Sequence, residues 1–309
     1  MSVGAWFLLL LHSLTAHPCR GTVSKHLPTR DPQLEVQMFS RETRHRALQK
    51  IFWSQPGRLV VRAVEGLSRR WNYVVMNRSL NSEVNGEEWL VTLLPANAMV
   101  LDVGFNKGDF SATVVRNRPH ARAIGFDPAR SMLLRFQANY AFKSQVELVP
   151  AAVSNASGSC TFIDTADGVS HIVSQATATA HGEERYDVPQ ITLDDFTRDR
   201  GIDSVDFLKV DAEGYDLHVL EGASRLLSSS QIAMFMFEFN DPWIITRRFL
   251  QEAAAFLESK PYRLFRLFNG FLSPFCYSHH AERHDLGCNY IGVSNERLAK
   301  GDMPIRPFP

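Results

Sequence analysis

The segment that decides the fold of this 309-residue chain is VLDVGFNKGDFS at residues 100–111. A run of apolar residues ends at Asp102, and a turn with Gly104 and Gly108 then leads into an amphipathic segment. This order predicts a buried strand, a glycine-containing turn and a helix. Glycines suit such a turn because it needs unusual backbone dihedrals and lets the backbone approach a ligand closely. A helix that begins at the carboxyl end of a strand is also a favourable ligand-binding position.

The spacing of the two glycines narrows the class of ligand. Three residues separate Gly104 from Gly108, whereas the turn that accommodates a dinucleotide pyrophosphate has the pattern Gly-x-Gly-x-x-Gly. The carboxylate of Asp102, two residues before the first glycine, favours a ligand with a positive ammonium group. A purely structural strand–turn–helix remains an alternative for this segment taken alone.

The next apolar run, at residues 121–126, ends in Asp127-Pro128. An acidic residue at the tip of the second strand can accept both hydroxyls of a ribose. Alternatively, Asp127 caps the helix that follows it. The glycine turn upstream favours the ribose interpretation.

Short apolar runs alternate with amphipathic segments along the rest of the chain. This alternation predicts an α/β fold with a doubly wound, mostly parallel sheet of seven strands. The expected strands are residues 99–103, 121–126, 146–149, 205–210, 232–239, 262–268 and 288–293. The expected helices are residues 110–116, 129–142, 217–227 and 243–258. Residues 159–163 and 186–192 are expected as extra strand segments around a polar loop, and a long loop is expected to join the last two strands.

We divide the chain into four parts. Residues 1–33 are expected to form a flexible segment, residues 34–95 a helical N-terminal extension, residues 96–296 the catalytic-type domain and residues 297–309 a tail. Within the first part, residues 5–11 resemble the core of a signal peptide but are not preceded by a positive charge. A cytoplasmic location is therefore expected.

Composition excludes several classes of protein. Lysine and arginine total 33, equal to aspartate and glutamate, which argues against a nucleic-acid partner held by its phosphates. The 4 cysteines are too few and too scattered for a disulfide framework. No apolar run approaches the roughly 20 residues that span a bilayer, so stable membrane insertion is not expected. The oligomeric state is not defined by the sequence.

Several segments together resemble those of FkbM-type methyltransferases, within the class I methyltransferases that use S-adenosylmethionine. The resemblance covers about residues 99–293 and implies a Rossmann-like fold with S-adenosylmethionine as cofactor. It departs from the usual pattern at residues 105–107 and at Asp127, where Glu is more common. The segments that carry it are VLDVGFNKGDFS, AIGFDPA, VELVPAAVSNASGSCTF, VPQITLDDF and VDFLKVDAEGYDLHVLEGASRLL.

The resemblance also implies which residues bind the cofactor. Asp102, Gly104 and Gly108, with Asn106 between the two glycines, are expected at its methionine part. Asp127 is expected at its ribose. The adenine is expected near Ala152 and Val153.

Lys209, Asp211 and Glu213 are the candidate catalytic residues. They occupy alternate positions at the end of an expected strand, so an extended backbone would direct all three to one face. Methyl transfer needs an acceptor oxygen that is aligned with the methyl group and loses its proton. We expect Asp211 beside the cofactor, and Lys209 and Glu213 orienting or deprotonating the acceptor. A structural ion pair between Lys209 and a carboxylate is the alternative.

Other candidates are less specific. Glu238 is a second candidate for acceptor binding, or caps a helix. The loop at residues 164–184, with His171 and His181, could close over an acceptor, although a solvent-exposed loop is the simpler interpretation. The set Cys276, His279, His280, His284 and Cys288 has zinc-ligand spacing but forms no compact knuckle, and we expect no metal.

The expected function is methylation of a hydroxyl on a sugar, a glycolipid or a polyketide-type natural product. The expected partner is thus a small-molecule or glycan acceptor. Two other classes stay open: an oxidoreductase with a nucleotide cofactor on a similar sheet, and a cofactor-binding protein without transfer activity.

Overall fold

The computed structural model describes residues 85–164, 171–172, 184–284 and 287–307, together with Gln49, Arg62, Val64, Gly66 and Leu67. The chain divides into two units, residues 1–62 and 63–309. In the first unit the structure describes Gln49 and Arg62, both helical. Most of the expected N-terminal extension, the signal-like residues 5–11 and His181 lie outside the described residues.

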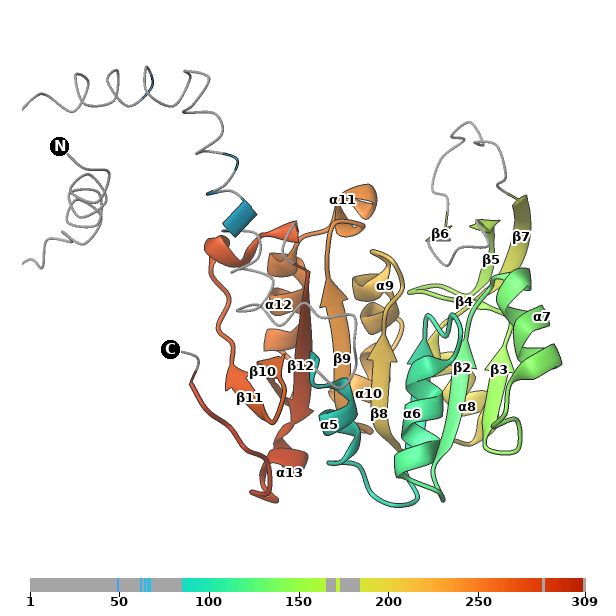
Figure 1. Cartoon of the computed structure of the whole chain (residues 1–309), viewed down its shortest axis with the longest axis horizontal. Helices are drawn as coiled ribbons and strands as arrows, with labels where there is room; N and C mark the ends of the chain where they lie inside the picture. Colours follow the sequence, from blue (N-terminus) through green and yellow to red (C-terminus); the bar gives the residue numbers. More distant parts are fainter. Residues whose placement is uncertain are drawn as a thin grey trace, which may run out of the picture. The chain divides into compact units, whose positions relative to one another are not determined.

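A large mixed sheet forms the centre of the second unit (Figure 1). Its five strands on one side, β9-β8-β1-β2-β3, are all parallel, and β12, β10 and β11 add to it in antiparallel pairs. The doubly wound α/β architecture expected from the sequence is therefore confirmed. In spatial order the strands are β11 (Phe271–Pro274), β10 (Tyr262–Phe268), β12 (Cys288–Ser294), β9 (Ile232–Phe239), β8 (Val205–Val210), β1 (Met99–Val103), β2 (Arg122–Phe126) and β3 (Val146–Val149).

The sheet has eight strands, one more than the seven predicted. The additional strand, β11, lies where the sequence predicted a loop. It pairs with β10 through a hairpin in which Phe268 lies opposite Phe271, so that only Asn269 and Gly270 form the connection. Asn-Gly is a preferred sequence for a two-residue hairpin connection, and here Gly270 has φ 86°, whereas the φ of Asn269 is not positive. This dipeptide was the signal for the eighth strand.

The extra strand segments predicted between β3 and β8 form a separate small sheet of order β4-β7-β5-β6. Its two long strands pair antiparallel over their whole length, and the short β4 pairs parallel to β7. Because β4 follows directly after β3, this sheet lies beside the carboxyl edge of the large one (Figure 1). The strands are β4 (Ala152–Val153), β5 (Gly158–Asp164), β6 (His171–Ile172) and β7 (Glu184–Ile191).

Helices cover both faces of the large sheet (Figure 1). The buried residues form two large clusters, one shared with α8, α9, α10 and α12, and the other with α5 and α6. No described helix is long and apolar enough to cross a membrane. The helices are α5 (Glu87–Val91), α6 (Asp109–Asn117), α7 (Arg130–Asn139), α8 (Leu193–Arg200), α9 (Asp216–Glu221), α10 (Ser224–Ser228), α11 (Trp243–Thr246), α12 (Leu250–Glu258), α13 (Asn295–Leu298) and the 3₁₀ turn η1 (His279–Ala281).

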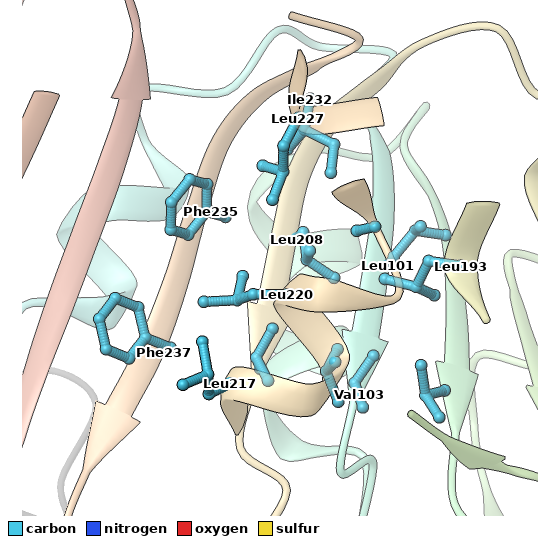
Figure 2. Packing of buried hydrophobic residues seen from close by; sticks show 14 of the residues in the cluster. Leu101, Val103, Leu193, Leu208, Leu217, Leu220, Leu227, Ile232, Phe235 and Phe237 are labelled. Carbon is cyan, nitrogen blue, oxygen red and sulfur yellow. The ribbon is translucent and has the colours of Figure 1, made fainter. Parts of the chain in front are cut away.

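Successive side chains of a strand point to opposite faces of the sheet, and this alternation explains the two clusters. In β9, Phe235 and Phe237 pack on the α9 side, whereas Met234 and Met236 pack on the α6 side. Figure 2 shows the first cluster, with Leu217 of α9 against the strand residues. Burying a side chain of this size contributes about 1.5–3 kcal/mol to the free energy of unfolding. A shift of one residue would move every side chain to the other face of the sheet, so burial fixes the register of these strands.

Two of the predicted helices are each divided into two. The segment 217–227 is interrupted at Gly222, where a Cβ atom would overlap the carbonyl oxygen of Ser154. The segment 243–258 is interrupted at Arg247, which adopts a left-handed conformation with φ 57°. Both interruptions depend on contacts or backbone angles that helical periodicity does not indicate.

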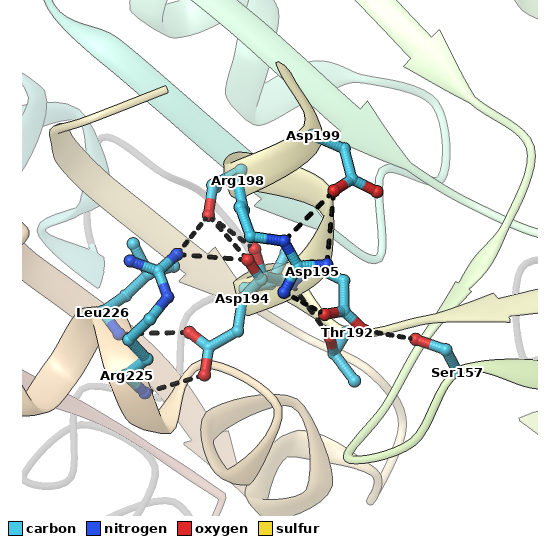
Figure 3. A network of polar contacts seen from close by, with 10 residues as sticks. Ser157, Thr192, Asp194, Asp195, Arg198, Asp199, Arg225 and Leu226 are labelled. Atoms are coloured by element: carbon cyan, nitrogen blue, oxygen red, sulfur yellow. Dashed lines mark hydrogen bonds and ion pairs between the residues drawn. The ribbon is translucent and has the colours of Figure 1, made fainter. Parts of the chain in front are cut away.

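A polar network links α8 to the start of α10 (Figure 3). The Asp194 carboxylate accepts the backbone N–H groups of Arg225 at 2.7 Å and Leu226 at 3.1 Å, at the start of α10. The hydroxyl of Thr192 accepts the N–H of Asp195 at 3.1 Å and thereby caps α8. Because these groups satisfy helix N–H donors that would otherwise lack partners, the network has a structural role.

Candidate active site

Two adjoining cavities lie at the carboxyl edge of the parallel strands. Cavity 1 lies between the tips of β1 and β2, the β3–β4 connection and the segment after β8. Cavity 2 lies between the tips of β1, β8 and β9, the start of α5 and the region before β12. Both are lined by Gly104, Asn106 and Asp211, so the two cavities meet at these residues.

Gly104 brings the first turn into direct contact with the segment after β8. Its φ is 79°, and a Cβ atom would overlap the carbonyl oxygen of Asp211. The backbone N–H of Asp211 in turn donates to the Val103 carbonyl at 3.0 Å. Only glycine allows this approach, which explains the first glycine of the motif.

Gly108 lines neither cavity, although the resemblance assigned it to the cofactor. It adopts φ 76° at the start of α6, and the rings of Phe105 and Tyr140 occupy the space that a side chain would need. The Tyr140 hydroxyl donates to the Gly108 carbonyl at 2.8 Å. This glycine therefore shapes the turn, and its expected role at the cofactor stays a prediction.

Asp127 holds two turns together at the edge of cavity 1. Its Oδ2 accepts the N–H of Asn106 at 2.7 Å, and its Oδ1 accepts the N–H of Ala129 at 2.9 Å. Burial raises the pKa of Asp127, while these two hydrogen bonds act in the opposite direction. An ionised carboxylate has about four acceptor positions, so Asp127 keeps capacity for a ligand diol. The capping and ligand-binding interpretations are thus compatible.

The far wall of cavity 1 is apolar. Ala152 and Val153, both predicted, line it together with Met132, Phe162 and Tyr215, which sequence reasoning missed. Phe162 comes from the small sheet, whose docking position no local pattern reveals. Flat apolar walls of this kind suit a planar ring.

Asp102 is buried at the tip of β1 and lines cavity 2. Its Oδ2 accepts the Ser111 hydroxyl at 2.6 Å, and its Oδ1 accepts no hydrogen bond from the described residues. Burial raises the pKa of Asp102 to about 6, although the nearby Lys209 ammonium lowers it. The Lys209 ammonium lies 3.9 Å from this Oδ1, too far for a hydrogen bond, so the buried oxygen can still accept one from a cationic ligand group.

Lys209 forms an ion pair with Asp211, with Nζ 2.9 Å from Oδ2. Burial alone would lower the pKa of Lys209, but the carboxylates of Asp211, Asp102 and Glu87 outweigh burial and raise it. The ammonium therefore stays charged at neutral pH. Of the two roles expected for Lys209, it can orient an acceptor but cannot remove a proton.

Glu213 lines cavity 1 together with Asp211 but does not share a cavity with Lys209. The strand ends at Val210, and Glu213 adopts φ 48° in the following turn, so the expected alternation does not extend to it. It lines cavity 1, whereas Lys209 lines cavity 2. Burial raises the pKa of Glu213 to about 7, and the charge of Asp211 adds to the effect. The prediction that all three side chains share one face is wrong.

Two further carboxylates line cavity 2 and come from two different elements. Glu238, a predicted candidate, lies near the end of β9, and Glu87, which sequence reasoning missed, begins α5. The amides of Asn85 and Asn289 donate to Glu87 Oε1 at 3.0 and 3.4 Å. Glu87 and Asn289 are 202 residues apart in the chain, and no sequence signal links them.

The remaining candidates do not converge. His284 packs its ring against Phe239 at 4.6 Å, Cys276 is exposed and Cys288 is buried. Within the described parts of the chain, no group of three or more His, Cys, Asp or Glu residues is arranged to hold a metal ion. Of the loop after Asp164, only residues 171–172 and the start of β7 are described.

A doubly wound sheet with this glycine turn and an acidic residue at the next strand tip defines an α/β protein of the Rossmann-like class. The particular family follows from a family model, the methyltransferase FkbM domain, which matches residues 102–264. The match covers more than half of the chain, and the protein belongs to the FkbM methyltransferase family.

Two curated relatives share part of the sequence. Methyltransferase sdnD of Sordaria araneosa is 29% identical over 162 residues, which are 43% of this chain and 62% of that protein. The AMB antimetabolite synthetase AmbE of Pseudomonas aeruginosa is 34% identical over 100 residues, 32% of this chain and 5% of that protein. The matched region thus spans less than two thirds of either relative.

Solved structures of similar fold include an FkbM methyltransferase from Methylobacillus flagellatus, with TM-score 0.41 and 16% identity over 63% of this chain and 44% of that chain. The plantazolicin methyltransferase BpumL in complex with SAH aligns with TM-score 0.36 and 10% identity, covering 80% and 94% of the two chains.

Proposed function

We propose that this protein is an S-adenosylmethionine-dependent methyltransferase that methylates a hydroxyl group. The observation that carries the proposal is the meeting of the two cavities at Gly104, Asn106 and Asp211. One cavity has the features of a nucleoside site, and the other is lined with charged and amide side chains. A methyl group held at their border would face an acceptor held in cavity 2.

The residues present fit this cofactor. Asp102 offers to an ammonium group a buried carboxylate oxygen that accepts no hydrogen bond from the described residues. Asp127 offers acceptor positions to a ribose diol. Ala152, Val153 and Phe162 offer apolar surface to an adenine ring. When bound, the cofactor supplies an activated methyl group on a sulfonium.

The protein's own residues then bind and align the two reactants. Gly104 and Asn106 fix the border of the cavities through backbone contacts with Asp211 and Asp127. The ion pair between Lys209 and Asp211 holds these two charged side chains in position at that border. Holding the acceptor oxygen in line with the methyl group removes most of the entropic cost of the reaction.

The acceptor in this proposal is a hydroxyl on a sugar, a glycolipid or a polyketide-type natural product. Membership of the FkbM methyltransferase family supports this class of acceptor. A cytoplasmic location is part of the proposal, because the cofactor is made and regenerated inside cells. N-terminal sequencing of the native protein tests the location, and a mature chain beginning near His17 would contradict it.

Calorimetric titration with S-adenosylmethionine, S-adenosylhomocysteine and NADH tests the cofactor. We expect the first two to bind and NADH not to bind, because Gly104 and Gly108 lack the dinucleotide spacing. Binding of NADH alone would favour the oxidoreductase. Cofactor binding without transfer of a labelled methyl group to any hydroxylated acceptor would favour a protein without transfer activity.

A further inference from the structure

We propose that cavity 2 binds a neutral, polyhydroxylated acceptor, in which Glu87 holds one hydroxyl and Glu238 removes the proton from the hydroxyl that is methylated. This inference rests on the proposed function. It assigns the acceptor side of the site to two carboxylates that enter the cavity from α5 and from β9.

Glu87 is fixed in place before any ligand arrives. Its Oε1 accepts both amide donors, from Asn85 and Asn289, and its backbone N–H donates to the Asn85 side chain at 2.9 Å. The preceding Gly86 has φ 95° and lies so close to Phe268 that a Cβ atom would be 2.9 Å from the Phe268 carbonyl oxygen. The start of α5 is thus docked onto the β10–β11 hairpin, and Glu87 is presented from a fixed backbone.

Glu238 is held in place by hydrogen bonds to its side chain and to its backbone carbonyl. Its Oε2 accepts the Asn240 amide at 3.0 Å, and its carbonyl accepts the Trp243 indole N–H at 2.8 Å. Asn289, a donor to Glu87, lies directly opposite Glu238 in the β9–β12 register. Neither Glu87 Oε2 nor Glu238 Oε1 accepts a hydrogen bond from the described residues. Each carboxylate therefore keeps one oxygen for a ligand.

The charges of cavity 2 select the class of acceptor. Its lining contains five acidic side chains and two lysines, and the Lys209 charge is already engaged by Asp211. Phosphates and carboxylates would be repelled. In the proposed function the cofactor already places its own ammonium group at Asp102 and its positive sulfonium at the border of the cavities, so an ammonium group on the acceptor would be repelled by both charges. Hydroxyl groups satisfy carboxylate acceptors without adding charge.

Glu238 has the chemistry of a general base. Burial raises the pKa of Glu238 to about 7, the charge of Asp211 raises it further, and Lys209 opposes these effects. Glu213 and Glu87 also raise it, and Asp216 is the other carboxylate that interacts with it. A base whose pKa is near the working pH is the most effective.

The proposed step is balanced. The acceptor oxygen forms a bond to the methyl carbon while the methyl–sulfur bond breaks, and that electron pair stays on sulfur. The acceptor O–H bond breaks, and its proton goes to the Glu238 carboxylate. The products are the methyl ether, S-adenosylhomocysteine and protonated Glu238, which returns its proton to water.

Saturation-transfer NMR tests the binding part, using the full chain with S-adenosylhomocysteine. The probes are methyl α-D-glucopyranoside, D-glucuronic acid and D-glucosamine, which are neutral, anionic and cationic. We expect only the neutral glycoside to bind, and E87A to weaken its binding about tenfold or more. Glu88 is the matched control, because it follows Glu87 in α5 and lines neither cavity, so E88A should bind normally. No binding of the neutral glycoside, or equal binding of glucuronic acid, overturns the proposal.

The proton step is tested by methyl transfer from labelled S-adenosylmethionine to the same glycoside between pH 5.5 and 8.5. We expect the wild-type rate to rise with pH through about 7. We expect E238Q to be about a hundredfold slower or more, without this rise, and with unchanged cofactor affinity and melting temperature. An E238Q variant with the wild-type rate and profile, or a glycoside that binds without being methylated, overturns the step. A wild-type protein that does not bind S-adenosylmethionine instead overturns the proposed function.

Discussion

The side chains of Lys209 and Asp211 form an ion pair of 2.9 Å where the two cavities meet. Lys209 is buried, whereas the Asp211 side chain is 38% exposed. The same ammonium lies 3.9 Å from the Asp102 carboxylate. One buried positive charge therefore compensates acidic groups on both β1 and the end of β8.

Replacing this lysine should destabilise the fold. K209M leaves Asp102 buried without its compensating charge, and removing one partner of a buried pair costs about 3–5 kcal/mol. We expect a loss of this size in urea unfolding at pH 7.5. The loss should be smaller at pH 5, where Asp102, with a pKa raised to about 6, is protonated. The exposed ion pair between Arg198 and Asp199 provides the control. D199A should change the free energy of unfolding by only about 0.5 kcal/mol. Equal losses at both pH values would show that Lys209 does not act through Asp102.

Asp211 should behave differently because it is partly exposed. We expect D211N to cost about 1 kcal/mol of stability, since solvent screens the lost charge. If Asp211 contacts the reacting groups, D211N also lowers turnover by about a hundred- to ten-thousand-fold. Melting temperature and turnover, measured on the same preparation, separate the two effects. A folded D211N protein with full activity would leave Asp211 with a structural role alone.

Cofactor affinity should depend on the ionisation of Asp102. A raised folded-state pKa means that the free protein binds the Asp102 proton more tightly than the unfolded chain does, so this group destabilises the fold as pH rises from about 4 to 6. An ammonium ligand prefers the ionised form. S-adenosylmethionine affinity should therefore increase from pH 5 to 7 in calorimetry. D102A should remove this increase and weaken binding at pH 7 by about 1.5–3 kcal/mol. An unchanged affinity would exclude Asp102 from the methionine site.

The first glycine should tolerate no side chain. In G104A the new Cβ overlaps the Asp211 carbonyl, so β1 and the segment after β8 must separate. Gly201 is a matched control, with φ 63° and open space around its Cβ position. G201A should cost about 1–2 kcal/mol for the left-handed backbone alone. G104A should cost clearly more in urea unfolding and should abolish cofactor binding. Similar losses for the two variants would contradict the close approach.

Glu213 tests whether a strained residue is kept for function. A non-glycine residue at φ 48° costs about 1–2 kcal/mol, and glycine removes this strain at an entropic cost of about 0.5–1 kcal/mol. E213G should therefore be as stable as the wild type or slightly more stable. Because Glu213 lines cavity 1, the same variant should bind S-adenosylmethionine more weakly. A destabilised E213G with normal cofactor affinity would assign Glu213 to folding.

Most of the strands and the glycine turn were predictable because their signals are local. Apolar runs such as Ile232–Phe239 form strands that are buried on both faces. A glycine is needed at position 104 because the turn there lies against the backbone of Asp211. The Asn269-Gly270 connection was equally local, and β11 could have been predicted from it. Asp127 was identified for the same reason, since it follows the second strand directly.

The two cavities, by contrast, were decided by tertiary packing. Glu87 and Asn289 are 202 residues apart in the chain, and only the docking of α5 and the β9–β12 register bring them together. Lys209 and Glu213 separate because the chain leaves the strand after Val210. The sequence by itself determined seven of the eight strands, the glycine turn and the family. Which charged groups face one another was decided by the tertiary structure, because burial and opposing charges act through space between elements that no local pattern connects.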